Sequence, residues 1–272
     1  MNPFRNSRLA TAPHPLRGPR LMMTFHASLV SGELDAKPSF TMEVGRVHFQ
    51  STFQDSNGPQ YASVPAWVLE TMPRPEIMTE FSISPVTPSL IKRFLRKLPN
   101  ASAPGPDRIS YLHLKKLPST HHFLATLFSN IILTNHRSPT IWCKGILHLI
   151  HKGGDTESLE NFCPISLTSC VGKLLHRILA SRLVEFMMAN NIINPELQKG
   201  FLSGNPKVFE HVLSLNAIID NAKQHSLPLS MTFIDLRNAF GSAPHKLISD
   251  MLHHIHVPAQ IQEYMCLTRT LN

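Results

Sequence analysis

An aspartate at the end of an apolar segment is the residue best suited to do chemistry in this chain. Residues 229–235 have the sequence Leu-Ser-Met-Thr-Phe-Ile-Asp, and Phe240 follows Asp235 by five residues. A strand that ends on Asp235 would place a carboxylate at the edge of a sheet, facing a cleft. Enzymes that transfer nucleotidyl groups need such carboxylates, because Mg²⁺ takes oxygen ligands and bridges to substrate phosphates. Alone, however, an aspartate at this position more often caps a helix or a turn.

A second candidate is a helix with one basic face, predicted over residues 87–98. Thr87 is a suitable N-cap, Pro88 suits the first helical position, and Pro99 ends the helix. The apolar residues repeat at spacings of three and four, and they are Leu90, Ile91, Phe94, Leu95 and Leu98. The opposite face carries Lys92, Arg93, Arg96 and Lys97. Such a face is either a solvated surface or a surface that contacts the phosphates of a nucleic acid.

The composition is compatible with a polyanionic partner and gives no sign of a metal site. The 272 residues carry a net charge of +8 and have a pI near 9.5, and basic proteins gain from the counterions that bound phosphates release. The four Cys lack CxxC spacing, and the 16 His have no neighbouring set of Cys or carboxylates, so no zinc site is predicted. No apolar run reaches the roughly 18 residues of a membrane span. We expect reduced thiols, a nuclear or cytoplasmic location and no membrane association.

The pattern along the chain predicts an α+β fold behind a poorly structured leader. Residues 1–80 are rich in Pro and begin with a basic arm, because residues 1–20 contain four Arg and no acid, and weak strand-like pieces such as Phe40–Phe49 stay unassigned. Strands are expected at 145–151, 161–167 and 229–235, and the first two are joined by a turn at Lys152-Gly153-Gly154-Asp155. Helices are expected over 87–98, 111–117, 123–132, 169–189 and 207–223, and from 244 onward. Because strands and helices do not alternate strictly, the α+β class is favoured.

Five short motifs, in order along the chain, resemble the reverse transcriptase of non-LTR (LINE-type) retrotransposons. They are APGPD at 103–107, LHLIHKGGD at 147–155, NFCPISLTS at 161–169, LQKGF at 197–201 and FIDLRNAF at 233–240. The spacing also matches, and the resemblance covers roughly residues 80–265. It implies a right-hand polymerase fold, in which APGPD is the amino-terminal extension motif and residues 147–167 are the fingers hairpin over the incoming nucleotide.

The resemblance also implies roles for individual residues. Asp235 matches the first metal-binding, catalytic aspartate of the palm, and the carbonyl of Leu236 is expected to reach the second metal ion. Phe240 matches the bulky gate that selects deoxynucleotides by clashing with a ribose 2′-hydroxyl. Lys152 matches the fingers lysine that lies near nucleotide or template phosphate. Mg²⁺ or Mn²⁺ would be the cofactor, and an RNA template, a DNA primer and deoxynucleotides would be the partners.

A further matched segment is the loop that contains Gln198, Gly200 and Phe201. In the family this loop packs the fingers against the palm. Its role here is therefore as much architectural as it is binding.

Several residues depart from the family pattern. Cys163 stands where the family has an arginine that grips the triphosphate, and a thiol offers no charge and only a weak hydrogen bond. Arg108 and Gly241 stand where the family usually has Gly and Asp, respectively. No adjacent Asp pair occurs in the chain, although the family builds its second metal site on one. Two-metal transfer needs carboxylates on both sides of the cation pair, so the fragment is expected to be inactive and to bind the metal poorly.

We therefore interpret residues 81–272 as a reverse transcriptase domain truncated within the palm, behind the leader of residues 1–80. One alternative is a non-catalytic nucleic-acid-binding module that has kept the basic fingers. Another is a decayed element or an incomplete gene model, in which a broken palm sheet would leave an unpaired edge. The sequence leaves the identity of any protein partner open.

Overall fold

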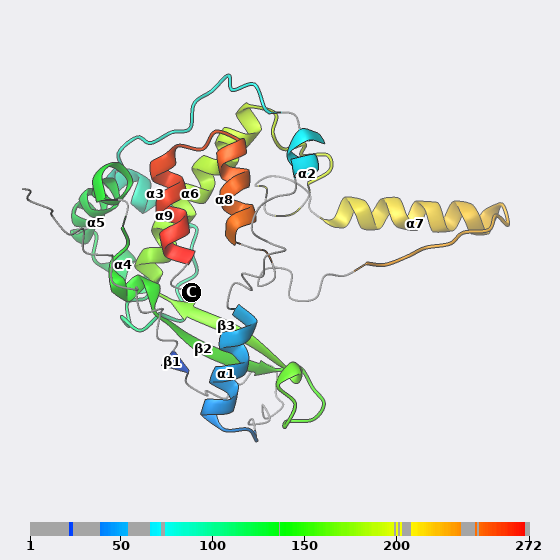
Figure 1. The fold of residues 1–272 in the computed structure, drawn as a ribbon, viewed down its shortest axis with the longest axis horizontal. Coiled ribbons are helices and arrows are strands. Elements are labelled where there is room, and N and C mark those ends of the chain that lie inside the picture. Colours follow the sequence, from blue (N-terminus) through cyan, green and yellow to red (C-terminus); the bar gives the residue numbers. More distant parts are fainter. Residues whose placement is uncertain are drawn as a thin grey trace, which may run out of the picture.

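The computed structural model describes residues 22–23, 39–53, 66–71, 74–135, 137–198, 200, 202, 208–234, 243 and 245–269. Helices and strands are mixed in the described part (Figure 1), in agreement with the predicted α+β class. The strands are β1 (Met22–Met23), β2 (Gly145–His151) and β3 (Phe162–Thr168). The helices are α1 (Met42–Phe53), α2 (Ala66–Thr71), α3 (Pro88–Arg96), α4 (Tyr111–Lys116), α5 (Thr120–Asn130), α6 (Cys170–Ala189), α7 (Val208–Gln224), α8 (His245–His254) and α9 (Ala259–Arg269).

The sheet consists of an antiparallel hairpin with one short strand added at its side. β2 pairs with β3 from Gly145 opposite Thr168 to His151 opposite Phe162, and β1 pairs in parallel with β2. Pro164 has no N–H to donate and is tolerated because β3 is the edge strand of the described sheet. The hairpin predicted from residues 145–167 is therefore confirmed.

The main core is organised around α6. Its apolar residues repeat at spacings of three and four, so one face packs in a common core with α3, α5 and α9 from Cys170 at its start to Phe186 near its end. The side chains that lose nearly all contact with solvent are Ile91 and Leu95 of α3, Phe128 of α5, Leu174, Leu175 and Ile178 of α6, and Ile261 and Tyr264 of α9. In Figure 1, α8 and α9 lie alongside α6. The helix predicted for residues 169–189 is thus the central element of the fold.

Two polar side chains of α6 hold the extended segment that precedes α3. At its C-terminal end, Asn190 accepts hydrogen bonds from the backbone N–H groups of Met78 (2.7 Å) and Thr79 (2.9 Å) and donates to Thr79 O (2.8 Å). About two turns earlier in the same helix, the buried Arg182 donates to Ser82 O (3.3 Å) and Ser84 O (2.6 Å). Because both side chains are buried, their polar atoms need these partners. Packing against α6 therefore begins at about residue 77, a few residues before the boundary expected at residue 81.

The other predicted helices are also present, and their ends follow the signals in the sequence. α3 begins after Thr87, whose Oγ1 accepts a hydrogen bond from Leu90 N (3.2 Å). α4, α5, α7 and α8 lie within a few residues of their expected ranges, whereas α9 was not predicted.

One segment that the sequence left unassigned is helical, and one expected strand is not found. Phe40–Phe49 lies mostly in helix α1, because Phe49 packs into a small core with Leu147, Leu149 and Phe162 of the hairpin, and this tertiary contact outweighs a weak local pattern. Residues 229–234 adopt no strand, since no described segment pairs with them and an unpaired strand leaves its backbone groups to water. The side chains of Phe233 and Ile234 are 81% and 87% exposed.

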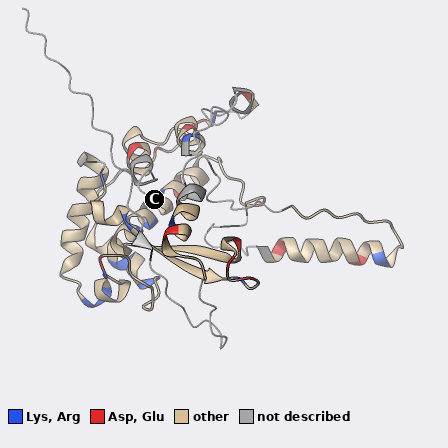
Figure 2. Ribbon diagram, turned by 60° about the horizontal axis from the view of Figure 1, so that its bottom comes forward, with Lys and Arg blue, Asp and Glu red and all other residues tan. Residues whose placement is uncertain are grey.

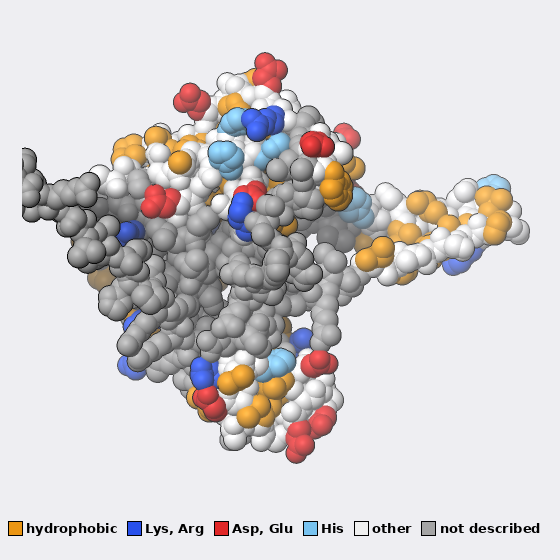
Figure 3. All heavy atoms as spheres, viewed as in Figure 1, with side chains coloured by type: hydrophobic (Ala, Val, Ile, Leu, Met, Phe, Trp, Pro, Cys, Tyr) orange, Lys and Arg blue, Asp and Glu red, His pale blue; other side chains and the backbone are white. Residues whose placement is uncertain are grey.

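Helix α7 forms a projecting arm with the segment that follows it. In Figure 1 the arm extends away from the other helices, and residues 227–234 return beside it. The turn between them has Ser226 at a φ of 51° and a hydrogen bond from Leu227 N to Ala222 O (2.9 Å). Figure 3 shows hydrophobic side chains along this arm, and Phe209, Val212 and Leu213 are exposed.

We predict that Asn190→Ala lowers the free energy of unfolding by about 1–3 kcal/mol, because the backbone N–H groups of Met78 and Thr79 would lose their shared acceptor. Urea denaturation followed by circular dichroism measures this loss. Asn216→Ala is the matched control, since Asn216 is exposed on α7. An equal loss in both variants would show that the Asn190 hydrogen bonds do not hold the segment.

Candidate functional site

The β2–β3 hairpin presents Lys152 at its tip. The ladder continues one residue beyond β2, because Lys152 N donates to Asn161 O (2.7 Å). The turn then uses Gly153 and Gly154 at φ angles of 99° and 87°, a backbone region that side chains rarely adopt. The Lys152 side chain is exposed. The structure therefore leaves its ammonium group accessible to an anionic partner.

Cys163 faces the same side of the hairpin as Lys152. It pairs with Ile150 across the ladder, and side chains two residues apart share one face of a strand. The thiol is half-buried and uncharged, so this face offers the ammonium of Lys152 without a guanidinium beside it. Cys163, which replaces the arginine of the family pattern, thus lies on the same face as Lys152, the predicted nucleotide-binding residue.

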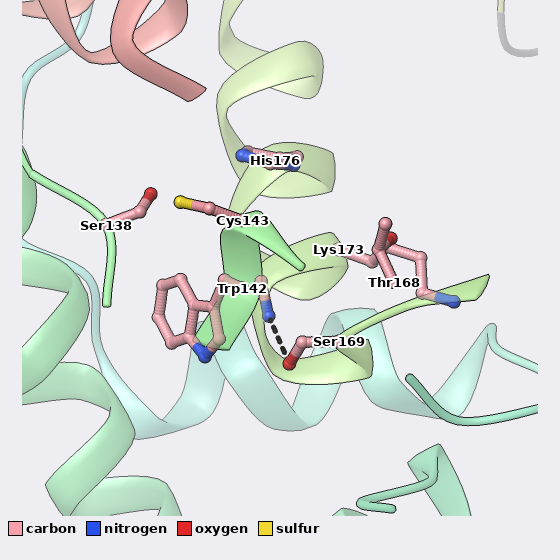
Figure 4. Close-up of a pocket in the computed structure, with 8 residues that line it drawn as sticks. Ser138, Trp142, Cys143, Thr168, Ser169, Lys173 and His176 are labelled. Atoms are coloured by element: carbon pink, nitrogen blue, oxygen red, sulfur yellow. Dashed lines mark hydrogen bonds between the residues drawn. The ribbon is translucent and has the colours of Figure 1, made fainter. Parts of the chain in front are cut away.

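The APGPD loop packs on the junction between β3 and α6. Ser169 Oγ donates to Asp107 Oδ2 (2.5 Å) and accepts from the N–H groups of Val171 (3.2 Å) and Gly172 (3.3 Å). Figure 4 shows Ser169 at the start of α6, with the bond from Gly172 drawn as a dashed line. Asp107 Oδ1 also accepts from Ile109 N (3.2 Å). Two motifs that are about 60 residues apart in the sequence are therefore joined through one hydroxyl.

The sequence predicts only one part of this contact. A serine directly before an amphipathic helix is an N-cap signal, and Ser169 meets it. Nothing in the sequence paired that serine with Asp107, because the contact depends on how the loop folds back.

Close backbone packing explains the glycine of the same loop. A Cβ atom on Gly105 would lie 2.5 Å from both Thr168 C and Ser169 N, which are backbone atoms and cannot move aside cheaply. The loop is further fixed by Cys170, whose fully buried thiol lies 3.8 Å from Ala103 O. Burial raises the pKa of the Cys170 thiol, so this cysteine is a packing residue and not a nucleophile.

A small cavity lies between the segment before β2, the end of β3 and the first turns of α6, and it is too small for a nucleotide. Its volume is about 50 Å³, and its walls include Trp142, Cys143, Ser169, Lys173 and His176. Figure 4 shows these side chains around the first turns of α6. A space of this size accommodates a water molecule or two.

The LQKGF loop borders a larger groove beside the second half of α6. The groove has a volume of about 550 Å³ and is lined mainly by apolar side chains, among them Val184, Met187 and Ile192. Gln198 and Gly200 are at its edge, and Gln198 Nε2 donates to Gly200 O (3.0 Å) within the same loop. Phe201 lies outside the described residues.

The basic face of α3 has the predicted arrangement. Ile91 and Leu95 are buried, whereas the side chains of Lys92, Arg93, Arg96 and Lys97 are exposed. The guanidinium carbon of Arg93 lies 5.8 Å from the centroid of the Phe94 ring. Figure 2 marks the Lys and Arg segments of the chain in blue. Within the described ranges, no carboxylate forms an ion pair with any of these four cations. Their charges are therefore available to an external anion.

The predicted catalytic residues are not placed by the structure. Asp235, Leu236 and Phe240 all lie outside the described residues. Among the residues that are described, no three His, Cys, Asp or Glu gather closely enough to hold a metal ion. Nor does the described part of the chain contain a helix long and apolar enough to cross a membrane.

Sequence comparisons identify known proteins to which this chain is similar. No family model matches the chain. The chain is 31% identical over 194 residues (71% of this chain, 21% of the relative) to a probable RNA-directed DNA polymerase from transposon BS of Drosophila melanogaster. It is 31% identical over 176 residues (62% and 18%) to a probable RNA-directed DNA polymerase from transposon X-element of the same species. It is 28% identical over 167 residues (60% and 18%) to the RNA-directed DNA polymerase from its mobile element jockey. The chain spans about a fifth of the length of these curated relatives.

We predict that Gly105→Ala destabilises the fold by about 2–3 kcal/mol, because the new methyl group overlaps backbone on two sides. Thermal or urea unfolding measures the change. Gly145→Ala is the control, since its nearest contact would be an ordinary 3.5 Å from Thr168 Cγ2. If the two alanine variants were equally stable, the APGPD loop could not be packed on the β3–α6 junction.

Proposed function

We propose that this chain, which is homologous to part of the RNA-directed DNA polymerases of non-LTR retrotransposons, is a reverse transcriptase domain segment with the fingers and the first part of the palm of a right-hand polymerase. The observation that carries the proposal is the pairing of sequence relationship with geometry: the hairpin carries Lys152 at its open tip, and the APGPD loop packs at its base. Residues 81–272 would form the domain and residues 1–80 the leader, with the packed segment from about residue 77 as the join.

The proposed roles follow the motifs. Lys152 would contact a phosphate of the nucleotide or the template, and Lys92, Arg93, Arg96 and Lys97 would contact the nucleic-acid backbone. Asp235 would be the catalytic, metal-binding carboxylate, with the Leu236 carbonyl at the second ion and Phe240 as the gate against ribonucleotides. The partners would be an RNA template, a DNA primer and deoxynucleotides, in the nucleus or cytoplasm.

The family reaction is attack of a primer 3′-hydroxyl on the nucleotide α-phosphate, and a bound Mg²⁺ or Mn²⁺ ion supplies the positive charge that this step needs. The described residues offer no group of metal ligands, so binding of such an ion by this chain would depend on Asp235. Cys163 removes a fixed cation from the hairpin face, which weakens stabilisation of the triphosphate.

A second candidate function is non-catalytic binding of nucleic acid. It is favoured by the four α3 cations, which have no ion-pair partner within the described ranges. The two candidates share the binding surface and differ in turnover.

We expect the purified 272-residue chain to lack polymerase activity, because one aspartate cannot hold two metal ions. Primer extension on poly(rA)/oligo(dT) with Mg²⁺ or Mn²⁺ tests this. Asp235→Ala provides the baseline. Incorporation above that baseline would falsify the inactivity and would assign Asp235 to catalysis.

We also expect the chain to bind RNA with an affinity that falls steeply with salt. Replacing Lys92, Arg93, Arg96 and Lys97 together by Gln should reduce the slope of log K against log salt by roughly 3, since each lost contact to a single strand removes about 0.7. Fluorescence anisotropy between low and moderate salt measures both slopes. Replacing Arg74, Arg177, Lys223 and Lys246 together by Gln is the control for net charge, because these four exposed cations lie outside α3. An unchanged slope in the α3 variant would remove this face from the binding surface.

A further inference from the structure

The positive charge of the chain is concentrated in one stretch. Residues 81–154 contain ten Lys and Arg but a single acid, Asp107, whereas the whole chain has a net charge of only +8. Asp107 is occupied by Ser169 and by its own loop. The ten cations are Lys92, Arg93, Arg96, Lys97, Arg108, Lys115, Lys116, Arg137, Lys144 and Lys152. The layer formed by α3, α4 and α5 therefore has an excess of cations with almost no carboxylates to offset it.

The structure brings the C-terminal ends of α3 and α4 together. Lys115 Nζ donates to Leu98 O (2.5 Å), just after α3, and to Asn100 Oδ1 (2.7 Å). Lys115 thus satisfies a carbonyl at the end of α3 and compensates the partial negative charge there. Arg96 and Lys97 lie at the same end of α3, and Lys116 is the last residue of α4.

The N-terminal end of α5 completes this corner. Thr120 Oγ1 donates to Leu117 O (2.7 Å), and the buried His121 ring is hydrogen-bonded to Leu114 O (2.9 Å), so the first turn of α5 is fixed against the end of α4. With His121 directed inward, its neighbours His122 and Phe123 lie on the solvent side, and Phe123 is 69% exposed. An exposed aromatic ring therefore lies in the first turn of α5, which is fixed against the end of α4 that carries Lys116.

A purely structural role accounts for part of this arrangement only. Cations at helix C-termini stabilise the helix dipole, and single exposed apolar residues are common on protein surfaces. Lys115 performs the capping role. Arg96, Lys97 and Lys116 add charge beyond that need, and within the described ranges none of the three forms an ion pair. Cations together with a solvent-exposed ring are what a single-stranded nucleic acid recognises, through its phosphates and the faces of its bases.

We propose that the basic corner, defined as Arg96, Lys97, Lys116, His122 and Phe123, binds single-stranded nucleic acid with one base stacked on Phe123. The proposal rests on the proposed function and deepens it, because it names the form of nucleic acid and extends the surface from α3 to α4 and α5. A duplex has its bases stacked on one another, so it offers phosphates to this corner but no free base face. Stacking therefore makes the corner prefer a single strand.

The test compares anisotropy of a labelled 12-nucleotide single-stranded RNA, the same sequence as single-stranded DNA, and an RNA duplex. Phe123→Leu keeps an apolar side chain but removes the ring, and it should weaken binding of both single strands about 5- to 10-fold while leaving duplex binding within about twofold. Phe123→Tyr should retain wild-type affinity. Phe209→Leu is the matched control, since Phe209 is 63% exposed on α7, and it should change none of the affinities.

The outcomes separate this proposal from the proposed function. If neutralising the α3 cations weakens binding while Phe123→Leu behaves like Phe209→Leu, stacking at the corner is wrong and the nucleic-acid function stands. If Phe123→Leu weakens duplex and single strand equally, the preference for a single strand is wrong. If the α3 variant and Lys116→Gln both bind as the wild type does, the corner and the basic face of α3 are both excluded.

Discussion

The hydrogen bonds of the Ser169 hydroxyl join three parts of the molecule at one point. The hydroxyl donates to Asp107 of the APGPD loop and accepts from two N–H groups at the start of α6, and Ser169 itself directly follows β3. Because Ser169 is 1% exposed, neither the carboxylate contact nor the N-cap can readily be replaced by water. The hairpin, the loop and the central helix therefore keep a fixed relation, and the position of Lys152 depends on it.

The other end of α6 is fixed by a different kind of contact. Asn190 and Arg182 bond to backbone groups of the segment between residues 78 and 84, so the chain that leads into α3 lies along α6. The burial of Arg182 lowers the pKa of its guanidinium, yet its two carbonyl partners compensate part of the lost hydration. Polar contacts thus fix both ends of the central helix, in addition to the apolar packing that runs along its length. Helix α3 packs into the core through Ile91 and Leu95, so its outer face can carry cations without disturbing that packing.

The distribution of charge and of apolar surface divides the molecule functionally. The layer of α3, α4 and α5 presents cations to solvent, whereas the α7 arm presents apolar side chains. The first kind of surface suits a polyanion, because each contact releases counterions. The second kind is normally buried against other structure. The hairpin tip is different again, because its loop carries Lys152 together with the exposed acids Asp155, Glu157 and Glu160.

The sequence alone determined the elements whose signals are local. The cap at Thr87, the apolar repeat of α6 and the glycines of the Lys152 turn each favour one conformation through nearby atoms, and the structure has these elements where they were expected. The resemblance of the motifs also identified the family to which the comparisons point. Asp235, Leu236 and Phe240 remain predictions, because they lie outside the described residues.

Only the tertiary structure decided the contacts between distant parts of the chain. Three such contacts are the Ser169–Asp107 bond, the bonds of Asn190 to Met78 and Thr79, and the bond by which Lys115 joins the ends of α3 and α4. In each case the local sequence of one partner gives no sign of the other. The same reason explains the unassigned segment that became a helix and the expected strand that is not found. Phe49 becomes part of a helix because the hairpin offers it a core, and residues 229–234 stay unpaired because a strand needs a neighbour that no local pattern can supply.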